Sequence, residues 1–207
     1  MKWKRLFDFF TALFLIILFM PIILCVALLV KIYLGSPILF KQLRPGLNAK
    51  PFYIYKFRTM TNDKDEQGNL LPEEKRVTRF GNLLRKYSLD ELPQLFNVIK
   101  GDLSLVGPRP LFTKYLPYYT EREMKRHSVK PGITGLSQIS GRNLLGWDER
   151  LELDVKYVEE RSFWLDMKIL LITVIKVFKK DGVAEFSNRP MLDLDEERRL
   201  KNKERDI

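Results

Sequence analysis

A long apolar run near the start of the chain, Phe9 to Val30, constrains the fold more than any other feature. As a helix rising about 1.5 Å per residue it would measure roughly 33 Å, close to the ~30 Å hydrocarbon core of a bilayer. The run is long for the apolar part of a cleavable signal peptide, and no small-x-small site separates it from Lys31. We therefore expect a retained membrane segment.

Two features of this segment argue against a simple crossing. Positive side chains flank both ends, at Lys2, Lys4 and Arg5 before it and at Lys31, Lys41, Arg44 and Lys50 after it. The positive-inside rule therefore finds no preferred outer end. Pro21 removes a backbone donor near the middle and divides the run into Phe9–Met20 and Pro21–Val30. The hypothesis is a re-entrant hairpin of two half-helices with both ends on the cytoplasmic face; an ordinary kinked spanning helix fits these residues equally well.

The charge and the scarce residue types exclude several classes of protein. The chain has 36 Lys and Arg residues against 26 Asp and Glu, a net charge of +10, so we expect an anionic partner: a phosphorylated substrate, an acidic membrane or nucleic acid. Cys25 and His127 are the only residues of their types, which leaves no internal disulfide and no Cys/His zinc cluster. No glycine spacing matches a Rossmann or Walker-type phosphate loop.

Beyond the apolar run, the pattern predicts an α+β fold that is mainly helical. Short strands at Ile38–Gln42 and Phe52–Phe57 flank a turn-forming sequence and predict a β-hairpin. Another short strand is predicted at Leu103–Val106. Helices are predicted around Phe80–Tyr87 and Ser88–Val98, after the capping-box sequence Thr120–Glu123, and around Trp147–Val158.

The C-terminal part carries one further apolar run and a charged end. The run from Phe163 to Lys180 is too short and too charged to span a bilayer. It predicts either an interfacial amphipathic helix against anionic lipid or a buried core helix. From Met191 onward, dense alternating charge predicts a solvated, frayed tail.

The first candidate for chemistry is the sequence from Ser88 to Pro93, SLDELP. Ser88 and Glu91 form a capping-box pattern, whereas Pro93 indicates a later helix start with Asp90 as the cap. In either case Asp90 and Glu91 lie in the first helical turn, where a carboxylate, a phosphate or a carboxylate-bound metal is stabilised. Helix capping alone is the simpler explanation of the pair.

The second candidate is a set of basic residues on stiff or glycine-rich backbone. In Gly107-Pro108-Arg109-Pro110 the prolines limit the backbone around Arg109, so its guanidinium has little freedom to lose on binding a phosphate. The other members are Arg142, which follows the glycine-rich Pro131–Gly135 and Gly141, Arg85, five residues before Asp90, and Lys56 and Arg58 at the end of the second strand. Each alone is typical of a solvated charge.

Two weaker signals have simpler explanations. Asp63-Lys64-Asp65 resembles the Asp-x-Asp that holds a metal and a nucleotide in some glycosyltransferases, but its polar surroundings favour a hydrated turn. His127 has no Ser-centred elbow to serve, so we expect it in a surface or capping role rather than in a catalytic triad.

The order of the motifs along the chain resembles a known family. After the apolar run with Pro21 come QLRPG (42–46), YKFRTM (55–60), SLDELPQLFN (88–97), GDLSLVGPRP (101–110), PGITG (131–135) and GRN (141–143). This order looks like that of the bacterial sugar transferases that are monotopic polyprenol-phosphate phosphoglycosyl transferases, and the likeness covers roughly residues 1–185. The compact form is similar to the enzyme that starts bacterial protein N-glycosylation by transferring diacetylbacillosamine phosphate.

The resemblance implies a ping-pong transfer of a sugar phosphate. Asp90 would be the nucleophile that takes the sugar phosphate from a UDP-sugar as an acyl phosphate and releases UMP, before undecaprenyl phosphate accepts it. Glu91 matches the second carboxylate, which would bind Mg²⁺ together with Asp90 or act as a base. The residues implied to hold phosphate or nucleotide groups are Arg85, Arg109 and Arg142, with Lys56 and Arg58 supporting them.

The resemblance also implies three parts and a location. These are a re-entrant membrane hairpin broken at Pro21 (residues 1–35), a compact catalytic domain with interfacial amphipathic helices (36–190) and a charged tail (191–207). The implied location is the bacterial inner membrane, in contact with its phospholipid, with the active site and both termini on the cytoplasmic face. No nucleic-acid partner is expected.

Two other functions remain open at the level of the sequence. A metal-dependent glycosyltransferase using Asp63 and Asp65 would transfer the sugar without its phosphate and release UDP rather than UMP. A membrane-tethered basic module would bind acidic lipid or nucleic acid, with a steep salt dependence and no need for Asp90.

Overall fold

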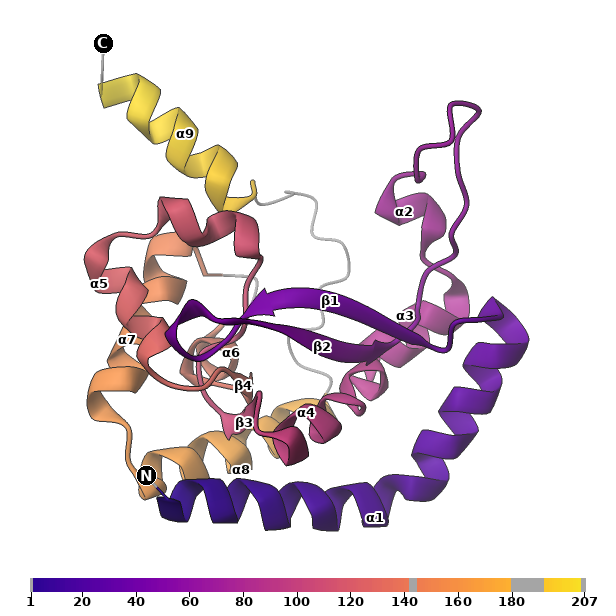
Figure 1. Cartoon of the computed structure of the whole chain (residues 1–207), viewed down its shortest axis with the longest axis horizontal. Coiled ribbons are helices and arrows are strands. Elements are labelled where there is room, and N and C mark those ends of the chain that lie inside the picture. Colours follow the sequence, from indigo (N-terminus) through magenta and orange to yellow (C-terminus); the bar gives the residue numbers. More distant parts are fainter. Residues whose placement is uncertain (1, 142–144, 180–191, 206–207) are drawn as a thin grey trace. The chain divides into compact units, whose positions relative to one another are not determined.

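The computed structural model (Figure 1) describes residues 2–141, 145–179 and 192–205. The chain divides into two compact units. Unit 1 comprises Met1–Gln42 and Tyr53–Gly101, and unit 2 comprises Leu43–Phe52 and Asp102–Ile207. The structure is mostly helical with two small sheets, which agrees with the predicted α+β class.

The elements are given unit by unit, in chain order within each unit. Those of unit 1 are α1 (Lys2–Leu34), α2 (Glu73–Arg76), α3 (Arg79–Lys86), the 3-10 turn η2 (Leu89–Glu91) and α4 (Gln94–Lys100). The paired strands β1 (Leu39–Pro45) and β2 (Pro51–Phe57) each contribute to both units. Those of unit 2 are η1 (Leu47–Ala49), β3 (Ser104–Val106), η3 (Thr113–Tyr118), α5 (Glu121–Met124), η4 (Lys125–Ser128), β4 (Gly132–Thr134), α6 (Leu136–Ser140), α7 (Trp147–Glu160), α8 (Phe163–Lys179) and α9 (Leu194–Arg205).

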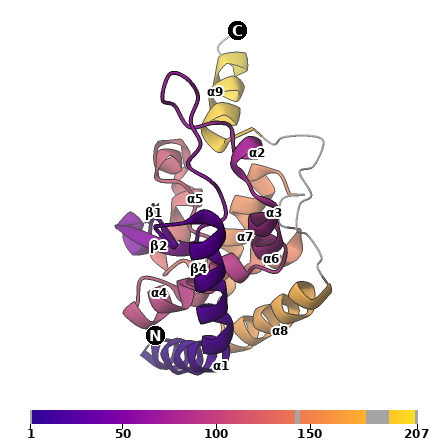
Figure 2. The ribbon, with the colours of Figure 1, turned by 90° about the vertical axis from the view of Figure 1, so that its right-hand side faces the viewer.

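Helix α1 continues through Pro21 instead of separating into two half-helices. Figures 1 and 2 show that its first part runs in one direction and its last part turns away toward β1. Proline produces such a bend because it removes one backbone donor and crowds the carbonyl four residues earlier, while the turns on either side keep their hydrogen bonds. The re-entrant path through a membrane stays a prediction.

The two faces of α1 have different surroundings. Six residues at helical spacing are buried: Asp8, Ala12, Ile16, Ile23, Val26 and Val30. On the outer face, six large apolar side chains are 61–65% exposed: Phe10, Phe14, Ile17, Leu24, Leu28 and Ile32. By length and composition α1 could cross a membrane, and only 22% of its most apolar window is buried inside the protein. Such a bare apolar face is typical of contact with lipid.

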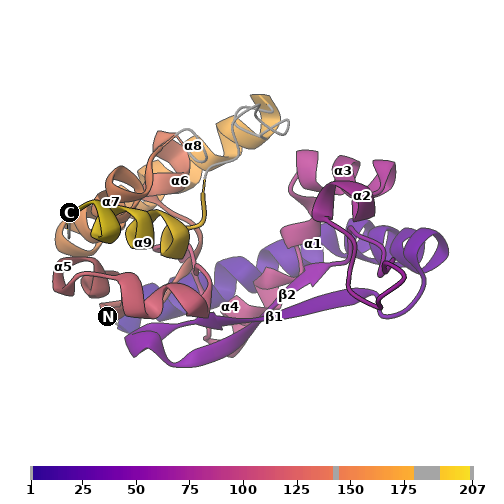
Figure 3. The ribbon, with the colours of Figure 1, turned by 90° about the horizontal axis from the view of Figure 1, so that it is seen from above.

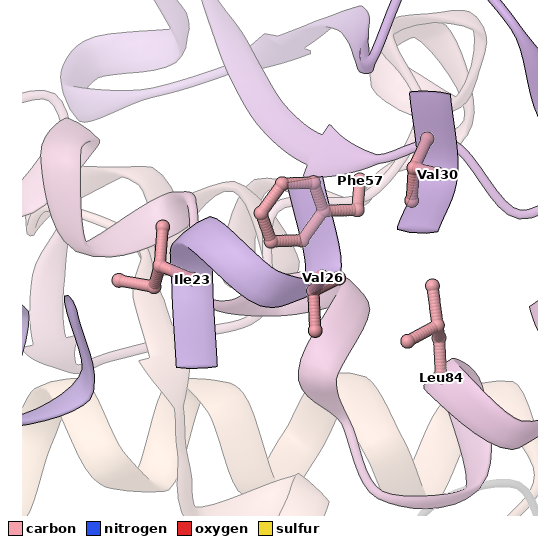
Figure 4. Packing of buried hydrophobic residues seen from close by; sticks show 5 residues of the cluster. All are labelled: Ile23, Val26, Val30, Phe57 and Leu84. Atoms are coloured by element: carbon pink, nitrogen blue, oxygen red, sulfur yellow. The ribbon is translucent and has the colours of Figure 1, made fainter. Parts of the chain in front are cut away.

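The last part of α1 forms the core of unit 1. Figure 4 shows Ile23, Val26 and Val30 close to Phe57 of β2 and Leu84 of α3. Leu89 and Leu92, which flank the Asp90-Glu91 pair in the sequence, pack against the same cluster. The first part of α1 is fastened through Arg5, whose guanidinium donates to the carbonyls of Val98 and Ile99 in the last turn of α4, at 2.5 and 2.7 Å.

Unit 2 is built on a short parallel pair, β3 and β4, with Ser104 opposite Gly132 and Val106 opposite Thr134. The sequence predicts β3 but not β4, which lies inside the glycine-rich 131–135 motif. Gly132 is required at this contact, because a Cβ there would lie 2.1 Å from the backbone nitrogen of Gly107. The pairing therefore joins two motifs that are far apart in the sequence.

Helix α8 combines the two predicted alternatives. Its inner face meets the short sheet, where Thr173 and Thr134 share a hydroxyl–hydroxyl hydrogen bond of 2.7 Å and Ile169 is fully buried. Its outer face leaves Trp164 79% exposed and Leu171 63% exposed. An amphipathic helix with bare aromatic and aliphatic side chains fits the interfacial prediction.

The predicted frayed tail is wrong for residues 194–205, which form α9 on η3 (Figure 3). Leu194 is fully buried in the cluster around Tyr115 and Trp147. Just before the helix, the carboxylate of Asp193 accepts hydrogen bonds from Lys114 at 2.6 Å and Tyr115 at 2.8 Å. The sequence does not predict this docking, because it depends on one buried leucine and a few specific polar contacts in a segment dominated by charged residues.

Candidate active site

The Asp90-Glu91 pair lies in η2, between α3 and α4. Ser88, which precedes η2, has a φ of +54°, a conformation that costs a non-glycine residue on the order of 1–3 kcal/mol and redirects the chain out of α3. Neither η2 nor α4 begins with a side-chain cap. Ser88 precedes η2 but makes no capping hydrogen bond, and Pro93 rather than Asp90 is the residue before α4, so neither predicted cap is found.

Lys56 on β2 is a basic side chain that the structure brings to this pair. Its Nζ lies 2.6 Å from Oε1 of Glu91 and 4.0 Å from Oδ2 of Asp90. Asp90 is buried, at 7% exposed, and Glu91 is half-buried. One ammonium thus offsets part of the charge of two adjacent carboxylates that are held largely away from water. The sequence named all three residues but could not predict their contact.

The other two basic candidates of unit 1 have different positions. Arg85 on α3 donates from Nε to Oγ1 of Thr59 at 3.1 Å, and α3 itself lies so close that a Cβ on Gly81 would be 1.9 Å from the Thr59 carbonyl oxygen. The guanidinium of Arg58 donates to the carbonyl of Leu34 and, at 3.1 and 3.3 Å, to those of Pro37 and Met60. Arg58 therefore joins the end of α1 to the end of β2, and its support of a substrate stays a prediction.

Arg109 lies in unit 2, on a loop whose backbone is fixed from several sides. Gly107 donates to the Thr134 carbonyl at 2.9 Å, and Gly132 donates to the Pro108 carbonyl at 3.0 Å. The carbonyl of Arg109 itself accepts a 2.6 Å hydrogen bond from Arg126. The expectation that this motif presents a guanidinium on rigid backbone agrees with these contacts.

Arg126 is anchored by a buried network in unit 2. Its guanidinium donates to Oδ2 of Asp154 at 2.7 and 3.2 Å, and Ser137 donates to Oδ1 of Asp154 at 2.7 Å. Arg126 is 2% exposed and Asp154 is 1% exposed. The two residues lie outside every motif singled out in the sequence, because only the fold brings α7 to η4.

The charge of Arg109 also acts on two further arginines, Arg44 and Arg150. Arg44 stacks on the ring of Phe112 at 3.8 Å, and Arg150 lies over Trp147 at 4.6 Å. Burial lowers the pKa of Arg44 to about 10, and the charge of Arg109 adds to this effect. Burial also lowers the pKa of Arg150; Asp154 opposes that shift and Arg109 reinforces it. Guanidiniums that lower one another's pKa favour an anion nearby.

The remaining candidates take less part in these arrangements. Arg142 lies outside the described residues. Asp65 accepts backbone hydrogen bonds from Gln67 and Asn69 at 3.0 and 2.8 Å, as a turn residue does. His127 is 5% exposed, so of the two predicted roles the surface one is wrong and the capping one stays a prediction; burial, together with the charge of Arg126, lowers the pKa of its imidazole to about 4.

The two carboxylates of Asp90 and Glu91 suit a magnesium ion whose remaining ligands come from water and a substrate. Within residues 2–141, 145–179 and 192–205, no three His, Cys, Asp or Glu side chains gather to hold a metal by themselves. Mg²⁺ commonly uses one or two carboxylates together with water and substrate phosphates. Asp90 and Glu91 provide two such carboxylates, so they fit this cation.

Comparisons with known proteins identify relatives over most of the chain. An uncharacterised sugar transferase of Bacillus subtilis strain 168, EpsL, is 58% identical over 182 residues, covering 88% of this chain and 90% of the relative. A UDP-glucose:undecaprenyl-phosphate glucose-1-phosphate transferase of Klebsiella pneumoniae is 42% identical over 86% of this chain, which spans only 40% of that relative. An N-acetylgalactosaminephosphotransferase of Aeromonas hydrophila, which uses undecaprenyl phosphate by name, is 39% identical over 83% of this chain and 42% of the relative.

The family comparison agrees with these relatives. Residues 1–180, which include all of unit 1, most of unit 2 and every motif of the resemblance, match the bacterial sugar transferase family. Helix α9 begins at Leu194 and so lies beyond the matched region. The chain therefore belongs to the bacterial sugar transferase family and is a transferase.

Proposed function

We propose that this protein transfers a sugar 1-phosphate from a UDP-sugar to undecaprenyl phosphate and releases UMP. The observation that carries the proposal is the buried Asp90, adjacent to Glu91, with the Nζ of Lys56 4.0 Å from its carboxylate. The names of the relatives support undecaprenyl phosphate as the acceptor class. The proposed product is the first membrane-bound intermediate of glycoconjugate or protein N-glycan assembly.

The reaction is proposed to proceed in two displacements at Asp90. A carboxylate oxygen of Asp90 attacks the β-phosphorus of the UDP-sugar, and the bond from that phosphorus to the bridging oxygen breaks, so UMP leaves with the bridging oxygen. An oxygen of undecaprenyl phosphate then attacks the same phosphorus. The acyl phosphate bond breaks, the Asp90 carboxylate is restored, and the sugar diphosphate lipid is released.

The surrounding residues are proposed to position the donor and to balance its charge. Glu91 would share the binding of Mg²⁺ with Asp90 or act as a base, and Lys56 keeps the two carboxylates and an incoming phosphate from repelling one another. Arg85, Arg109 and Arg142 would bind phosphate or nucleotide groups. Bound Mg²⁺ would supply charge neutralisation to the diphosphate of the donor.

The sugar is proposed to be N-acetylated, with diacetylbacillosamine or a related sugar as the first candidate. This part of the proposal rests on the resemblance of the motif order to that of the transferases of diacetylbacillosamine phosphate. The relatives' names include glucose and N-acetylgalactosamine, so a panel of UDP-sugars measured under one set of conditions is the appropriate comparison. The sugar with the highest kcat/KM identifies the donor.

Intact-protein mass spectrometry tests the covalent step. The full-length protein in detergent or nanodiscs is mixed with the UDP-sugar and Mg²⁺ but no lipid acceptor. We expect the mass of the protein to increase by one sugar phosphate and one equivalent of UMP to be released per protein. The adduct should be lost when undecaprenyl phosphate is added. Turnover with UDP as the released nucleotide would instead establish the metal-dependent glycosyltransferase that uses Asp63 and Asp65.

The proposed membrane arrangement comprises a re-entrant hairpin in residues 1–35, a cytoplasmic domain in residues 36–190 and the segment from 191 onward, all at the inner membrane. The exposed apolar faces of α1 and α8 support contact with phospholipid. Both termini would then lie in the cytoplasm, next to the leaflet that holds a lipid phosphate.

Labelling of single cysteines distinguishes the two topologies. The variant Cys25→Ser removes the native thiol, and a cysteine is then added at either end of the chain. We expect a membrane-impermeant maleimide to label neither terminus from the periplasm of intact cells and both after lysis. Labelling of one terminus from the periplasm would establish a spanning helix.

A further inference from the structure

We propose that Gln94 is a further catalytic residue, whose side-chain amide donates a hydrogen bond to the phosphoryl group while it is attached to Asp90. This inference rests on the proposed function. It begins from a buried polar atom: Gln94 is 2% exposed, and its Nε2 has no hydrogen-bond partner among the described residues. Burying an amide donor without a partner destabilises the folded protein. Such a cost is expected where a ligand completes the hydrogen bond.

The backbone places Gln94 on the same face as Asp90. Leu92 and Pro93 both have right-handed helical dihedral angles, so the chain is helical from η2 into α4. Residues four apart in such a segment are neighbours on one side. Asp90, Gln94 and Asn97 lie within the buried half of this segment, which also includes Leu95 and Val98, whereas Phe96 on the opposite side is exposed.

Strand β2 runs along this face and fixes its direction. The side chain of Asn97 donates to the carbonyl of Tyr53 at 2.7 Å and accepts from the backbone nitrogen of Tyr55 at 3.1 Å. The next residue of the strand, Lys56, reaches Asp90 and Glu91. Gln94 therefore lies between the contact at Asn97 and the contact at Asp90, along the strand that carries Lys56.

This position explains why the amide of Asn97 is hydrogen-bonded to β2 whereas the Nε2 of Gln94 has no partner in the described part of the chain. Asn97 is paired on both sides and holds β2 against α4. The Nε2 of Gln94 has two N–H bonds to donate and no partner among the described residues, and Gln94 follows Asp90 by four residues in a helical stretch, which puts both residues on one side of it. A preorganised hydrogen-bond donor next to developing negative charge stabilises the transition state more than it stabilises the bound UDP-sugar.

Substitution by methionine separates this role from a structural one. Gln94→Met keeps a similar volume and removes the buried amide. We expect kcat for UMP release to fall by about 10²- to 10³-fold with little change in KM, as for the loss of one donor to a transition-state oxyanion. The thermal midpoint should stay the same or rise, because the substitution removes a buried N–H donor that has no partner among the residues that the structure describes.

Asn97→Leu is the matched control on the same face. It removes an amide that is paired with β2, so we expect the thermal midpoint to fall, whereas Gln94→Met should not lower it. A burst of UMP release measured without lipid acceptor isolates the first step. If wild-type protein forms the adduct and Gln94→Met forms it at an equal rate, Gln94 has no such role although the proposed function stands. If wild-type protein forms no adduct, the proposed function itself fails.

Discussion

Replacing Asp90 by asparagine is expected to abolish turnover and leave the fold intact. The amide of Asp90→Asn has nearly the shape of the carboxylate but is not a competent nucleophile toward phosphorus, so UMP release should fall by at least about 10³-fold. The nearer partner of Lys56 is Glu91, at 2.6 Å against 4.0 Å for Asp90, so that ion pair remains. The rate of UMP release and the adduct mass, measured together, check this expectation.

Variants of the other carboxylates make the result specific. Glu91→Gln should impair turnover severely, and it should also weaken the dependence on Mg²⁺ if Glu91 helps to bind the cation. Asp65→Asn changes a turn residue that accepts hydrogen bonds from its own loop, so it should leave UMP release unchanged. Full activity of Asp90→Asn would refute the nucleophile assignment. Loss of activity in Asp65→Asn would point to the rival glycosyltransferase.

The parts of the fold that the sequence predicts are those with local signals. Helix α5 begins at Thr120 with both hydrogen bonds of the capping box, which also lies in the sequence as T-E-R-E. The turn-forming residues between β1 and β2 predict the hairpin for the same reason. These features depend on residues within about four positions of each other, which is the range over which backbone conformation is set by neighbours.

The parts that the sequence does not predict depend on distant contacts. Strand β4 has only three residues and pairs with β3, from which it is separated by η3, α5 and η4. Its glycine is selected by a close approach to Gly107, which no local pattern reveals. Helix α9 is similar, because one buried leucine and a few polar contacts hold a segment whose composition resembles a solvated tail.

The candidate site divides in the same way. The motif order brings attention to Asp90, Glu91 and Arg109. The ammonium of Lys56 beside the two carboxylates follows from β2 lying on α4, and the arrangement of Arg126 behind Arg109 follows from the packing of α7 on η4. A single sequence contains neither distance, since each joins segments that are adjacent only in the fold.

Removal of the Asp154 carboxylate is expected to cause the largest loss of stability. Asp154→Ala leaves the guanidinium of Arg126 buried without its carboxylate and removes the acceptor of Ser137. Removing one partner of a buried ion pair lowers the free energy of unfolding by about 3–5 kcal/mol. Denaturant unfolding of the full-length protein in detergent, followed by circular dichroism, should show this loss. Turnover should fall as well, because Arg126 also holds the carbonyl of Arg109.

Glu152→Ala is the matched control, because Glu152 lies on the same helix and also pairs with an arginine. Its pair with Arg122 is at the surface, where both side chains are at least half exposed, so its removal should have little effect on unfolding. The double variant Arg126→Met, Asp154→Leu should regain much of the stability, since apolar residues can replace a buried ion pair. Its activity should stay low, because methionine cannot donate to the Arg109 carbonyl. Equal losses of stability in Asp154→Ala and Glu152→Ala would show that the buried network contributes no more than a surface pair. Recovery of turnover in the double variant would show that Arg109 does not depend on Arg126.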